Sequence, residues 1–438
     1  MLSRICLNNN TITHLIILKL YLYVQLPETN AKKGKKMSKF RGKALLPSRF
    51  VSSYILPALF KDPSNWSMLP HQVRKYFSQL DPQKDVPIGQ ISLRVNEVCN
   101  LRCSSCGQWG ENGHLKLKLE RGERLDQLDF DTVKRVIFET RRDKPFYYVW
   151  GGEPTMWKPL VPFFQELAKY KLKGSVVSNA QDLSRQLEDL IDTGALAVLF
   201  LSLDGWDSES QNIMRSSASS KLSNNFEKTM EVIEKANEIK KRKNLHFPLI
   251  IPITVISNHN YSHLAQIHEL VVDKAQLHPF YFGWFITEER AALHEKVHEE
   301  RFGYKPENHK GYLKSCFNDV DPVETAKQIV EIRKMSKGRA CSPQFLPDIE
   351  TEAQIRRYYS DHSWHCGYPN CESIYFAAEI SPDGRMTPCR DYQDYTAGNI
   401  NESSFYDIWN GEEYKKFRRE MKKGLMPVCT RCCGLQGF

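Results

Sequence analysis

The sequence predicts an α/β protein whose main domain is a partial (β/α)6 TIM-like barrel, followed by a loop-rich C-terminal extension. Three observations predict this fold. Short apolar segments alternate with amphipathic helical segments between about residues 87 and 287, which implies parallel strands joined by right-handed crossovers. Cysteines and short polar motifs follow directly after several of these strands. A second group of cysteines lies among turn residues near the C-terminus.

The expected strands are short and rich in β-branched or aromatic residues. They are PIGQISLRV (87–95), PFYYVWGG (145–152), GSVVSNA (174–180), AVLFLSLDG (197–205), FPLIIPITVI (247–256) and HPFYFGWFI (278–286). The segments between them repeat apolar residues at helical spacing. These are FDTVKRVIFETRR (130–142), LVPFFQELAKYK (160–171), LSRQLEDLIDTG (183–194), NNFEKTMEVIEKANEIKKRKN (224–244) and YSHLAQIHELVVDKA (261–275). Residues 87–287 are therefore expected to form the barrel domain.

The segments before the barrel differ from it in composition. Residues 1–36 hold six basic residues and one acidic residue, so about +4 of the chain's net charge of +9 remains for the rest. Their apolar run is broken by Lys19 and is too short to span a bilayer. We interpret residues 1–36 as a doubtful N-terminal extension with Met37 as the possible true start, and an interfacial membrane anchor is the alternative. Residues 37–86 are expected to be a helical segment.

Two further segments follow the barrel. Residues 288–362 are mostly charged and helical in pattern, and we interpret them as a helical bridge or lid. Residues 363–438 are loop-rich. Within them, EISPDGRMTPC (379–389) predicts a hairpin that turns at Asp383 and Gly384, and SSFYDIWNGEEYKKFRREMKKG (403–424) predicts a helix.

The first cysteine group directly follows the first strand. VCNLRCSSCGQW (98–109) spaces Cys99, Cys103 and Cys106 as C-x3-C-x2-C. Secreted disulfide scaffolds are usually short and dense in cysteine, unlike this chain. The spacing therefore indicates a metal site in a reducing, cytoplasmic compartment. Three thiolates can hold three irons of a [4Fe–4S] cluster and leave the fourth iron open to a small molecule. The alternative is a zinc site completed by a remote His or Cys.

Polar and glycine-containing motifs follow the later strands. They are WGGEP (150–154), SNA (178–180), SLDG (202–205) and TVISNHN (254–260). The carboxyl ends of barrel strands meet at one rim, where active sites form. Gly151 and Gly152 allow the backbone to approach a ligand closely, and Glu153 offers a carboxylate to a cation. Ordinary strand-end turns and caps are the alternative interpretation.

With its three-cysteine motif and WGGEP, the sequence over about 87–287 resembles the radical S-adenosylmethionine (radical SAM) superfamily. The resemblance implies that Cys99, Cys103 and Cys106 bind a [4Fe–4S] cluster whose open iron is chelated by S-adenosylmethionine (SAM). It also implies reductive cleavage of SAM to a 5′-deoxyadenosyl radical that removes hydrogen from a substrate, with an electron donor such as flavodoxin or ferredoxin. The implied cofactor-binding residues are Gly151, Gly152, Glu153, Pro154, Ser178, Asn179, Ser202, Asp204 and Asn258. Ser105 departs from the family, which often has an aromatic residue before the third cysteine.

Residues 363–438 resemble the SPASM/twitch type of C-terminal extension, which carries auxiliary iron–sulfur clusters. A cysteine, the PDG hairpin, a second cysteine and a terminal C-x2-C carry this resemblance. It implies one closed auxiliary cluster, expected to be [4Fe–4S], held by Cys371, Cys389, Cys429 and Cys432. Cys366 is an alternative to Cys371, and Cys433 is left over. A four-cysteine zinc ribbon is the other possibility.

The expected function is that of a radical SAM oxidoreductase or maturase-type enzyme acting on a peptide, a protein or a sugar-linked metabolite. SPASM relatives often act on peptides, but residues 37–86 lack the strand-rich pattern of a leader-peptide binding module. The alternatives are a zinc-stabilised, non-catalytic binding protein and a tRNA-modifying radical SAM enzyme, the latter disfavoured by the weak charge of the body. No nucleic-acid or membrane partner is expected. The thirteen histidines show no metal-ligand spacing, and no catalytic acid, base or relay residue follows from the sequence.

Overall fold

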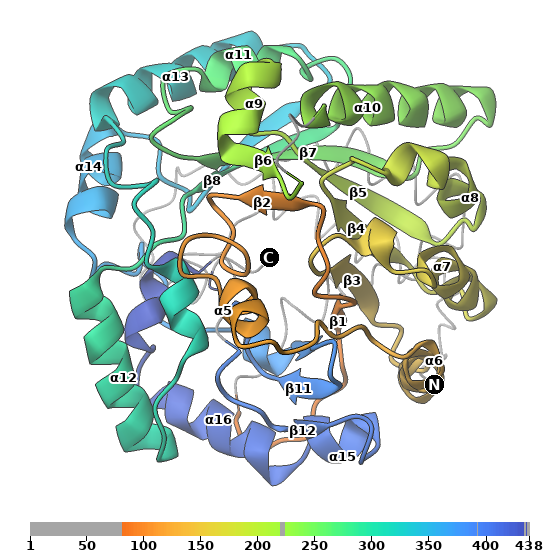
Figure 1. The fold of residues 1–438 in the computed structure, drawn as a ribbon, viewed down its shortest axis with the longest axis vertical. Helices are drawn as coiled ribbons and strands as arrows, with labels where there is room; N and C mark the ends of the chain where they lie inside the picture. Colours follow the sequence, from red (N-terminus) through yellow and green to blue (C-terminus); the bar gives the residue numbers. More distant parts are fainter. Residues whose placement is uncertain (1–80, 220–223, 392, 433–434, 436–438) are drawn as a thin grey trace, which may run out of the picture.

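The computed structural model describes residues 81–219, 224–391, 393–432 and 435. A ten-stranded sheet curves into an open barrel with helices around its outside (Figure 1). The central strands are all parallel, which confirms the predicted TIM-like fold, and they are β1 (Gln90–Arg94), β3 (Phe146–Trp150), β4 (Gly174–Ser178), β5 (Leu196–Ser202), β7 (Leu249–Ile256) and β8 (Leu277–Phe282). The predictions for residues 1–36 and 37–80 lie outside the described residues. Residues 81–86 form turns and extended chain.

Both edges of the sheet are extended by segments that lie outside residues 87–287. On one edge β9 (Ser342–Leu346) pairs in parallel with β8. On the other edge β10 (Ala377–Ile380) pairs in parallel with β1, and β11 (Arg385–Thr387) and β12 (Gly398–Asn399) follow in antiparallel order. The segment 288–362, predicted to be helical, thus also contributes a strand, because all five residues of β9 are buried.

The helices cover the outer face of the sheet. They are α6 (Phe130–Thr140), α7 (Leu160–Lys169), α8 (Leu187–Asp192), α9 (Ser208–Met214), α10 (Asn225–Arg242), α11 (Leu264–Glu269), α12 (Glu288–Phe302), α13 (Pro322–Met335), α14 (Glu352–Ser360), α15 (Phe405–Trp409) and α16 (Glu412–Lys422). Local sequence explains where they begin. For example, the Asp129 carboxylate caps α6 by accepting a hydrogen bond from the Thr132 backbone N–H over 2.8 Å.

The two faces of the barrel strands have different neighbours. Ile91 and Leu93 of β1 belong to the main core, which also contains Val136 of α6 and Phe163 of α7. The alternate position of this strand, Ser92, is polar yet buried. Because side chains alternate along a strand, we place Ser92 on the inner face of the barrel. A small apolar cluster without any helix residue lies on β5, β7 and β8 and comprises Leu249, Ile251 and Leu277 with Val198, Phe200 and Ile253 packed against it.

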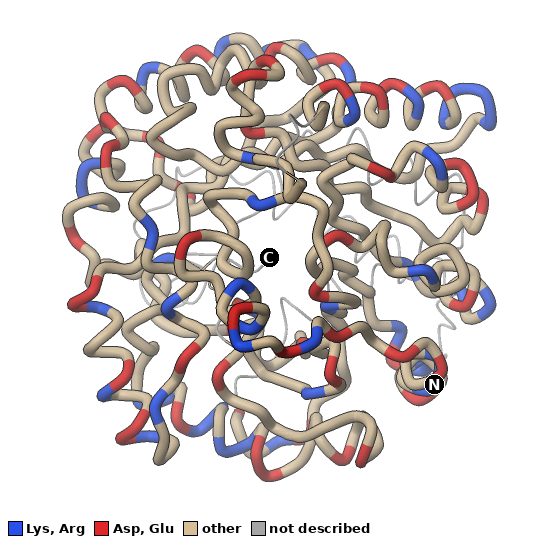
Figure 2. Tube along the Cα trace, viewed as in Figure 1, with Lys and Arg blue, Asp and Glu red and all other residues tan. Residues whose placement is uncertain are grey.

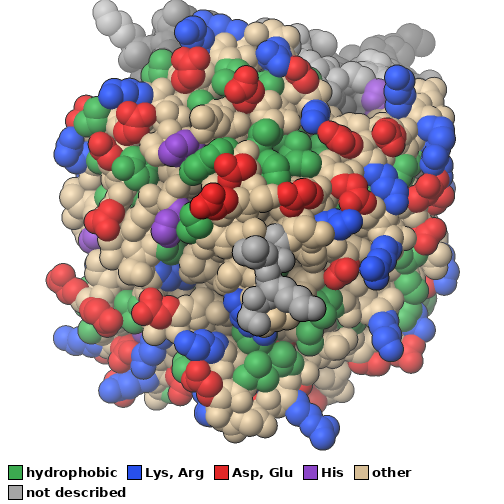
Figure 3. All heavy atoms as spheres, turned by 45° about the horizontal axis from the view of Figure 1, so that its top comes forward, with side chains coloured by type: hydrophobic (Ala, Val, Ile, Leu, Met, Phe, Trp, Pro, Cys, Tyr) green, Lys and Arg blue, Asp and Glu red, His purple; other side chains and the backbone are tan. Residues whose placement is uncertain are grey.

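Acidic and basic residues are interspersed along the outer helices (Figure 2). The face shown in Figure 3 likewise mixes acidic, basic and apolar side chains over the described residues. Within the described ranges, no helix combines the length and the apolar character that crossing a bilayer requires.

Candidate active site at the mouth of the barrel

The first cysteine loop is fixed to the barrel by a small second sheet. β2 (Leu101–Cys103) pairs in antiparallel fashion with β6 (Arg215–Ser217), so that Cys103 lies opposite Arg215. The loop then turns, with the Cys106 N–H donating to the Cys103 carbonyl over 3.1 Å. Cys99, Cys103 and Cys106 are free thiols of intermediate exposure. In Figure 1, β2 and the short helix α5 (His114–Glu120) lie inside the ring of outer helices, above and below the centre of the view.

Several N–H groups point at the sulfur atoms of this loop. Cys99 Sγ accepts from the Leu101 N–H over 3.4 Å, and Cys106 Sγ accepts from Gln108 and Trp109 over 3.3 and 3.4 Å. Donors of this kind stabilise negative charge on sulfur and tune iron–sulfur clusters. Burial raises the pKa of Cys103 to about 11, with the Arg215 guanidinium opposing the shift. Metal binding would therefore release a proton from this thiol.

The described thiols are less closely grouped than one other set of side chains. Among the described residues, the metal-capable side chains whose ligand atoms gather within 4.8 Å are His294, His309 and Asp394. Within the same ranges, neither cysteine group places three sulfur atoms that close together.

The two glycines of WGGEP are required by the close approach of two backbone segments. A Cβ added at Gly152 would lie 2.2 Å from the carbonyl oxygen of Val98, and one added at Gly151 would lie 2.7 Å from that of Asn96. The N–H groups of Gly152 and Glu153 donate to Asn96 and Val98, each over 2.8 Å. The end of β3 is thereby fastened to the chain that leads into the cysteine loop. Pro154 is buried and opens the 3₁₀ turn Pro154–Met156.

Glu153 connects the end of β3 to the end of β4. Its side chain is 1% exposed. One carboxylate oxygen accepts from the Ser178 hydroxyl over 2.8 Å and from the Thr155 hydroxyl over 2.8 Å, and the other accepts from the Asn179 N–H over 2.8 Å. Burial raises the pKa of Glu153, and these hydrogen bonds oppose the shift. The Asn179 amide in turn donates to the Asn100 side chain over 2.8 Å, next to Cys99.

Asp204 organises the opposite side of the mouth. Its carboxylate is fully buried and accepts from Arg215 Nε and from the Val255 N–H, both over 2.7 Å. Arg215 also approaches Cys103 Sγ at 3.7 Å through a terminal nitrogen. Ser202, at the end of β5, is buried. The structure thus brings Glu153, Ser178, Asn179, Ser202 and Asp204 to the strand ends around the cysteine loop.

Asn258 is engaged elsewhere. Its side-chain amide donates to the Ser315 carbonyl over 3.1 Å and accepts from the Asp319 N–H over 3.0 Å. It therefore fixes the chain that follows α12, while Asn260 donates to the Asp204 carbonyl over 2.9 Å. The cofactor-binding role expected for Asn258 stays a prediction.

The chain around residues 311–316 lies directly over the cysteine loop, which the sequence did not predict. A Cβ added at Gly311 would lie 2.2 Å from the Gly107 carbonyl oxygen. Lys314 Nζ donates a hydrogen bond to the Ser105 carbonyl. The Cys316 thiol lies 3.9 Å from the carbonyl oxygen of Ser104. Lys314 is 8% exposed. Its position could not be found from a local motif, because it depends on contacts across more than 200 residues.

The second cysteine group forms part of one apolar cluster. Cys429 and Cys432 are buried members of it, and Cys366, Cys371 and Cys389 pack against it. Burial raises the pKa of Cys429 to about 12, and the charge of Cys371 is the second cause of this rise. The Cys432 thiol donates to the Asp391 carboxylate over 3.0 Å.

Cys366 has different charged neighbours from Cys371. Burial raises the pKa of Cys366 to about 12, and the charges that act on it belong to Arg431, Arg357 and Asp361. The charge of Cys371 thus acts on Cys429, whereas the charges that act on Cys366 belong to other residues, although both cysteines pack against the same cluster. Cys433 lies outside the described residues.

Comparison with known proteins identifies the two parts of the chain. A family model for the radical SAM superfamily matches residues 93–271, and a model for the iron–sulfur cluster-binding domain SPASM matches residues 371–433. The AdoMet-dependent heme synthase of Methanosarcina barkeri is 24% identical over 355 residues, which cover 77% of this chain and 87% of that protein. The PqqA peptide cyclase of Rhodopseudomonas palustris is 23% identical over 354 residues, which cover 78% of each.

A solved structure shares the fold. SuiB of Streptococcus suis bound to S-adenosylmethionine superposes with a TM-score of 0.53 at 14% identity, over 79% of this chain and 72% of that chain. The radical SAM domain binds a [4Fe–4S] cluster and SAM, and the SPASM domain binds auxiliary iron–sulfur clusters. Residues 93–271 of this chain thus form a radical SAM domain and residues 371–433 a SPASM domain, and the protein is an enzyme.

Proposed function

We propose that this enzyme cleaves SAM reductively at the Cys99, Cys103 and Cys106 loop and removes a hydrogen atom from a peptide or protein substrate. The observation that carries the proposal is the position of the three thiols. They lie at the strand ends of the barrel, fastened by β2 and β6, beside the buried carboxylates of Glu153 and Asp204. A [4Fe–4S] cluster held there would supply the electron that breaks a C–S bond of SAM and yields the 5′-deoxyadenosyl radical.

The remaining work falls to the protein's own side chains, which position the cofactor and exclude water. Gly151, Gly152, Glu153 and Pro154 form the β3 end of the proposed SAM site. Glu153 also sets the rotamer of Ser178 and the backbone of Asn179 at the β4 end. Ser202 and Asp204, at the end of β5, form the opposite side of the proposed SAM site. The auxiliary cluster is assigned to Cys371, Cys389, Cys429 and Cys432.

The chain at residues 311–316 covers the cysteine loop and would exclude water from it. Gly311 contacts Gly107, and Lys314 holds the Ser105 carbonyl. Hydrogen abstraction needs a reactive carbon held close to the radical in a dry site. A substrate would therefore enter beside residues 311–316 and leave that cover in place.

Two relatives favour a peptide over a sugar-linked metabolite. One is the PqqA peptide cyclase already described. The other is the structure of SuiB bound to the precursor peptide SuiA, which aligns with 96% of this chain at a TM-score of 0.53 and 12% identity. The heme synthase relative makes a cofactor precursor the second substrate class to test. We further propose flavodoxin or ferredoxin as the electron donor and the cytoplasm as the compartment.

The test uses the full chain, reconstituted anaerobically with iron and sulfide and supplied with SAM and a reductant. We expect release of 5′-deoxyadenosine, and its loss when Cys99, Cys103 and Cys106 are all replaced by Ala. Candidate peptides encoded near the gene should speed that release and return with a changed mass, whereas sugar-linked metabolites and porphyrin precursors should not. Release that persists in the triple variant contradicts the proposed cluster site. A faster release with a metabolite alone contradicts the proposed substrate class.

A further inference from the structure

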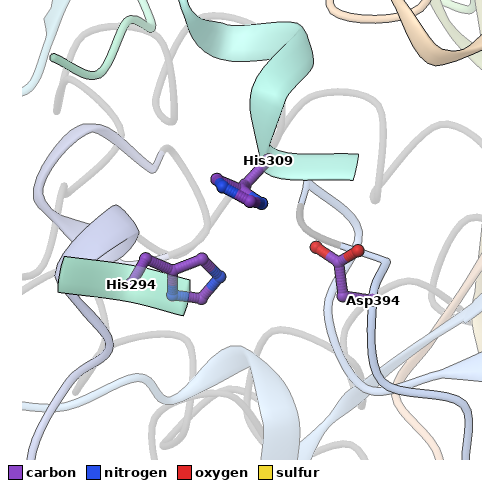
Figure 4. A group of neighbouring side chains, drawn as sticks. All are labelled: His294, His309 and Asp394. Atoms are coloured by element: carbon purple, nitrogen blue, oxygen red, sulfur yellow. The ribbon is translucent and has the colours of Figure 1, made fainter. Parts of the chain in front are cut away.

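Three side chains, one from α12 and two from other segments, face one another (Figure 4). His294 lies on α12, His309 lies in the 3₁₀ turn Asn308–Tyr312, and Asp394 lies in the loop between β11 and β12. One ligand atom from each lies within 4.8 Å of the other two. We propose that this cluster is a binding site for a divalent cation of the zinc type, separate from both cysteine groups.

One oxygen of the Asp394 carboxylate accepts hydrogen bonds from the backbone, and the other accepts none from the described residues. Oδ1 accepts from the backbone N–H groups of Glu307 and Asn308, both over 2.7 Å. The Tyr304 hydroxyl donates to the Asp394 carbonyl over 2.7 Å and fixes the backbone there. Oδ2 is buried and accepts no hydrogen bond from any described residue. A buried carboxylate oxygen in that state fits a cation, because native proteins rarely leave such an atom unsatisfied.

The two imidazoles have the burial and the protonation state that metal ligands need. His309 is 0% exposed and its Nδ1 has no hydrogen-bond partner in the described part of the chain, while its Nε2 lies 3.4 Å from a carboxylate oxygen of Glu295. His294 is buried, and its ring centroid lies 5.1 Å from that of His309. Burial lowers the pKa of both rings, that of His294 to about 3. Both are therefore neutral, which is the form that binds metal.

Two imidazoles and one carboxylate form a ligand set that zinc and its neighbours in the first transition row prefer. Zinc bonds of about 2.0–2.2 Å would draw the three ligand atoms to about 3.5 Å from one another. From separations of at most 4.8 Å, each pair of ligand atoms would approach by about 1.3 Å or less. The fourth position would hold water.

The site would connect the bridge to the loop of the SPASM domain. Asp394 lies in the loop between β11 and β12, which also holds Cys389. A cation at Asp394 would fasten this loop to α12 and to the turn Asn308–Tyr312. The inference stands on its own and does not depend on the proposed reaction.

The first experiment uses the full chain with its iron–sulfur clusters in place. The protein is passed over a chelating resin and titrated with Zn²⁺ against a chromophoric chelator, with iron content measured before and after. We expect about one equivalent of tightly bound zinc and unchanged iron. Diffraction at the zinc edge from crystals of the same sample should place the anomalous peak among His294, His309 and Asp394.

The second experiment compares variants. Because even indirect partners of a metal site change affinity by about 10–100-fold, His309→Ala and Asp394→Asn should each weaken zinc binding by about 100-fold or more. His259→Ala, which removes an exposed histidine elsewhere, is the matched control and should bind as wild type. Equal affinity in all variants, or a wild-type crystal with no zinc peak at the three residues, overturns the proposal. The crystal result decides the question even where a variant does not fold.

Discussion

The guanidinium of Arg215 donates from Nε to the Asp204 carboxylate over 2.7 Å, and both side chains are buried. The same guanidinium lies 3.7 Å from Cys103 Sγ. Burial is the largest single influence on the pKa of Arg215 and lowers it. The nearby negative charges, of which Asp204 contributes most, outweigh burial and raise the pKa. One ion pair therefore connects the end of β5 to the cysteine loop.

We expect Arg215→Met to destabilise the protein by about 3–5 kcal/mol, because it leaves a buried carboxylate without its cation. Asp204→Asn combined with Arg215→Met should cost less than the sum of the two single changes, since the pair is then removed together. Urea unfolding of the four proteins gives the coupling energy. An additive result would mean that the two side chains do not interact in solution.

Glu153→Gln is expected to slow 5′-deoxyadenosine release by about 100-fold, on the scale of a lost positioning or hydrogen-bonding group. The amide NH2 of Gln replaces one of the two carboxylate oxygens and cannot accept, so either the Ser178 and Thr155 hydroxyls or the Asn179 N–H loses its acceptor. The β4 end of the proposed SAM site would then shift. Iron content should stay unchanged, which separates loss of SAM positioning from loss of the cluster. Glu166→Gln is the matched control, because this buried glutamate on α7 pairs with Lys169 away from the strand ends. Equal rates in the two variants would contradict the assigned role.

Cys371→Ser should lower the iron content by about one cluster, whereas Cys366→Ser should leave it unchanged. The reason is that the charge of Cys371 raises the pKa of the Cys429 thiol. The charges that change the pKa of Cys366 belong instead to Arg431, Arg357 and Asp361. Iron and sulfide analysis of anaerobically reconstituted variants measures the difference. Loss of iron in Cys366→Ser, with full iron in Cys371→Ser, would exchange the two residues in the ligand set.

Glu379 on β10 should make stability depend on pH. Burial raises its pKa from 4.5 to about 8, with smaller opposing effects that include the Trp150 indole N–H at 3.0 Å. The folded protein then keeps a proton on Glu379 that the unfolded chain loses. Its contribution to stability is present below about pH 4.5 and is lost as pH rises toward about 8.

The check is the free energy of unfolding of wild type and Glu379→Gln between pH 5 and 8. Wild type should lose up to about 1.4 kcal/mol per pH unit relative to the variant, because Gln does not titrate. Parallel curves would mean that Glu379 is ionised in the folded protein.

The sequence by itself determined the parallel barrel and separated the cysteines into two groups. Apolar strands alternating with amphipathic helices leave one common solution, and C-x3-C-x2-C after the first strand predicts where the chemistry lies. Such signals are local, because each lies within a few residues of the chain. The same locality explains why the PDG hairpin at Asp383 and Gly384 was found, with Gly384 at φ +84°.

Tertiary structure alone decided which distant residues complete the site. Arg215 meets Asp204 and Cys103, Lys314 meets Ser105, and β9 and β10 join the barrel sheet at its two edges. His294 and His298 stand at i, i+4 on α12 in HEKVH, a spacing that metal sites use and that the expectation of no metal-ligand spacing overlooked. His309 and Asp394, which meet His294 in space, share no such local pattern with it. Contacts of this kind form when separate elements pack their apolar faces together, and that packing places polar side chains side by side without leaving a pattern in the local sequence.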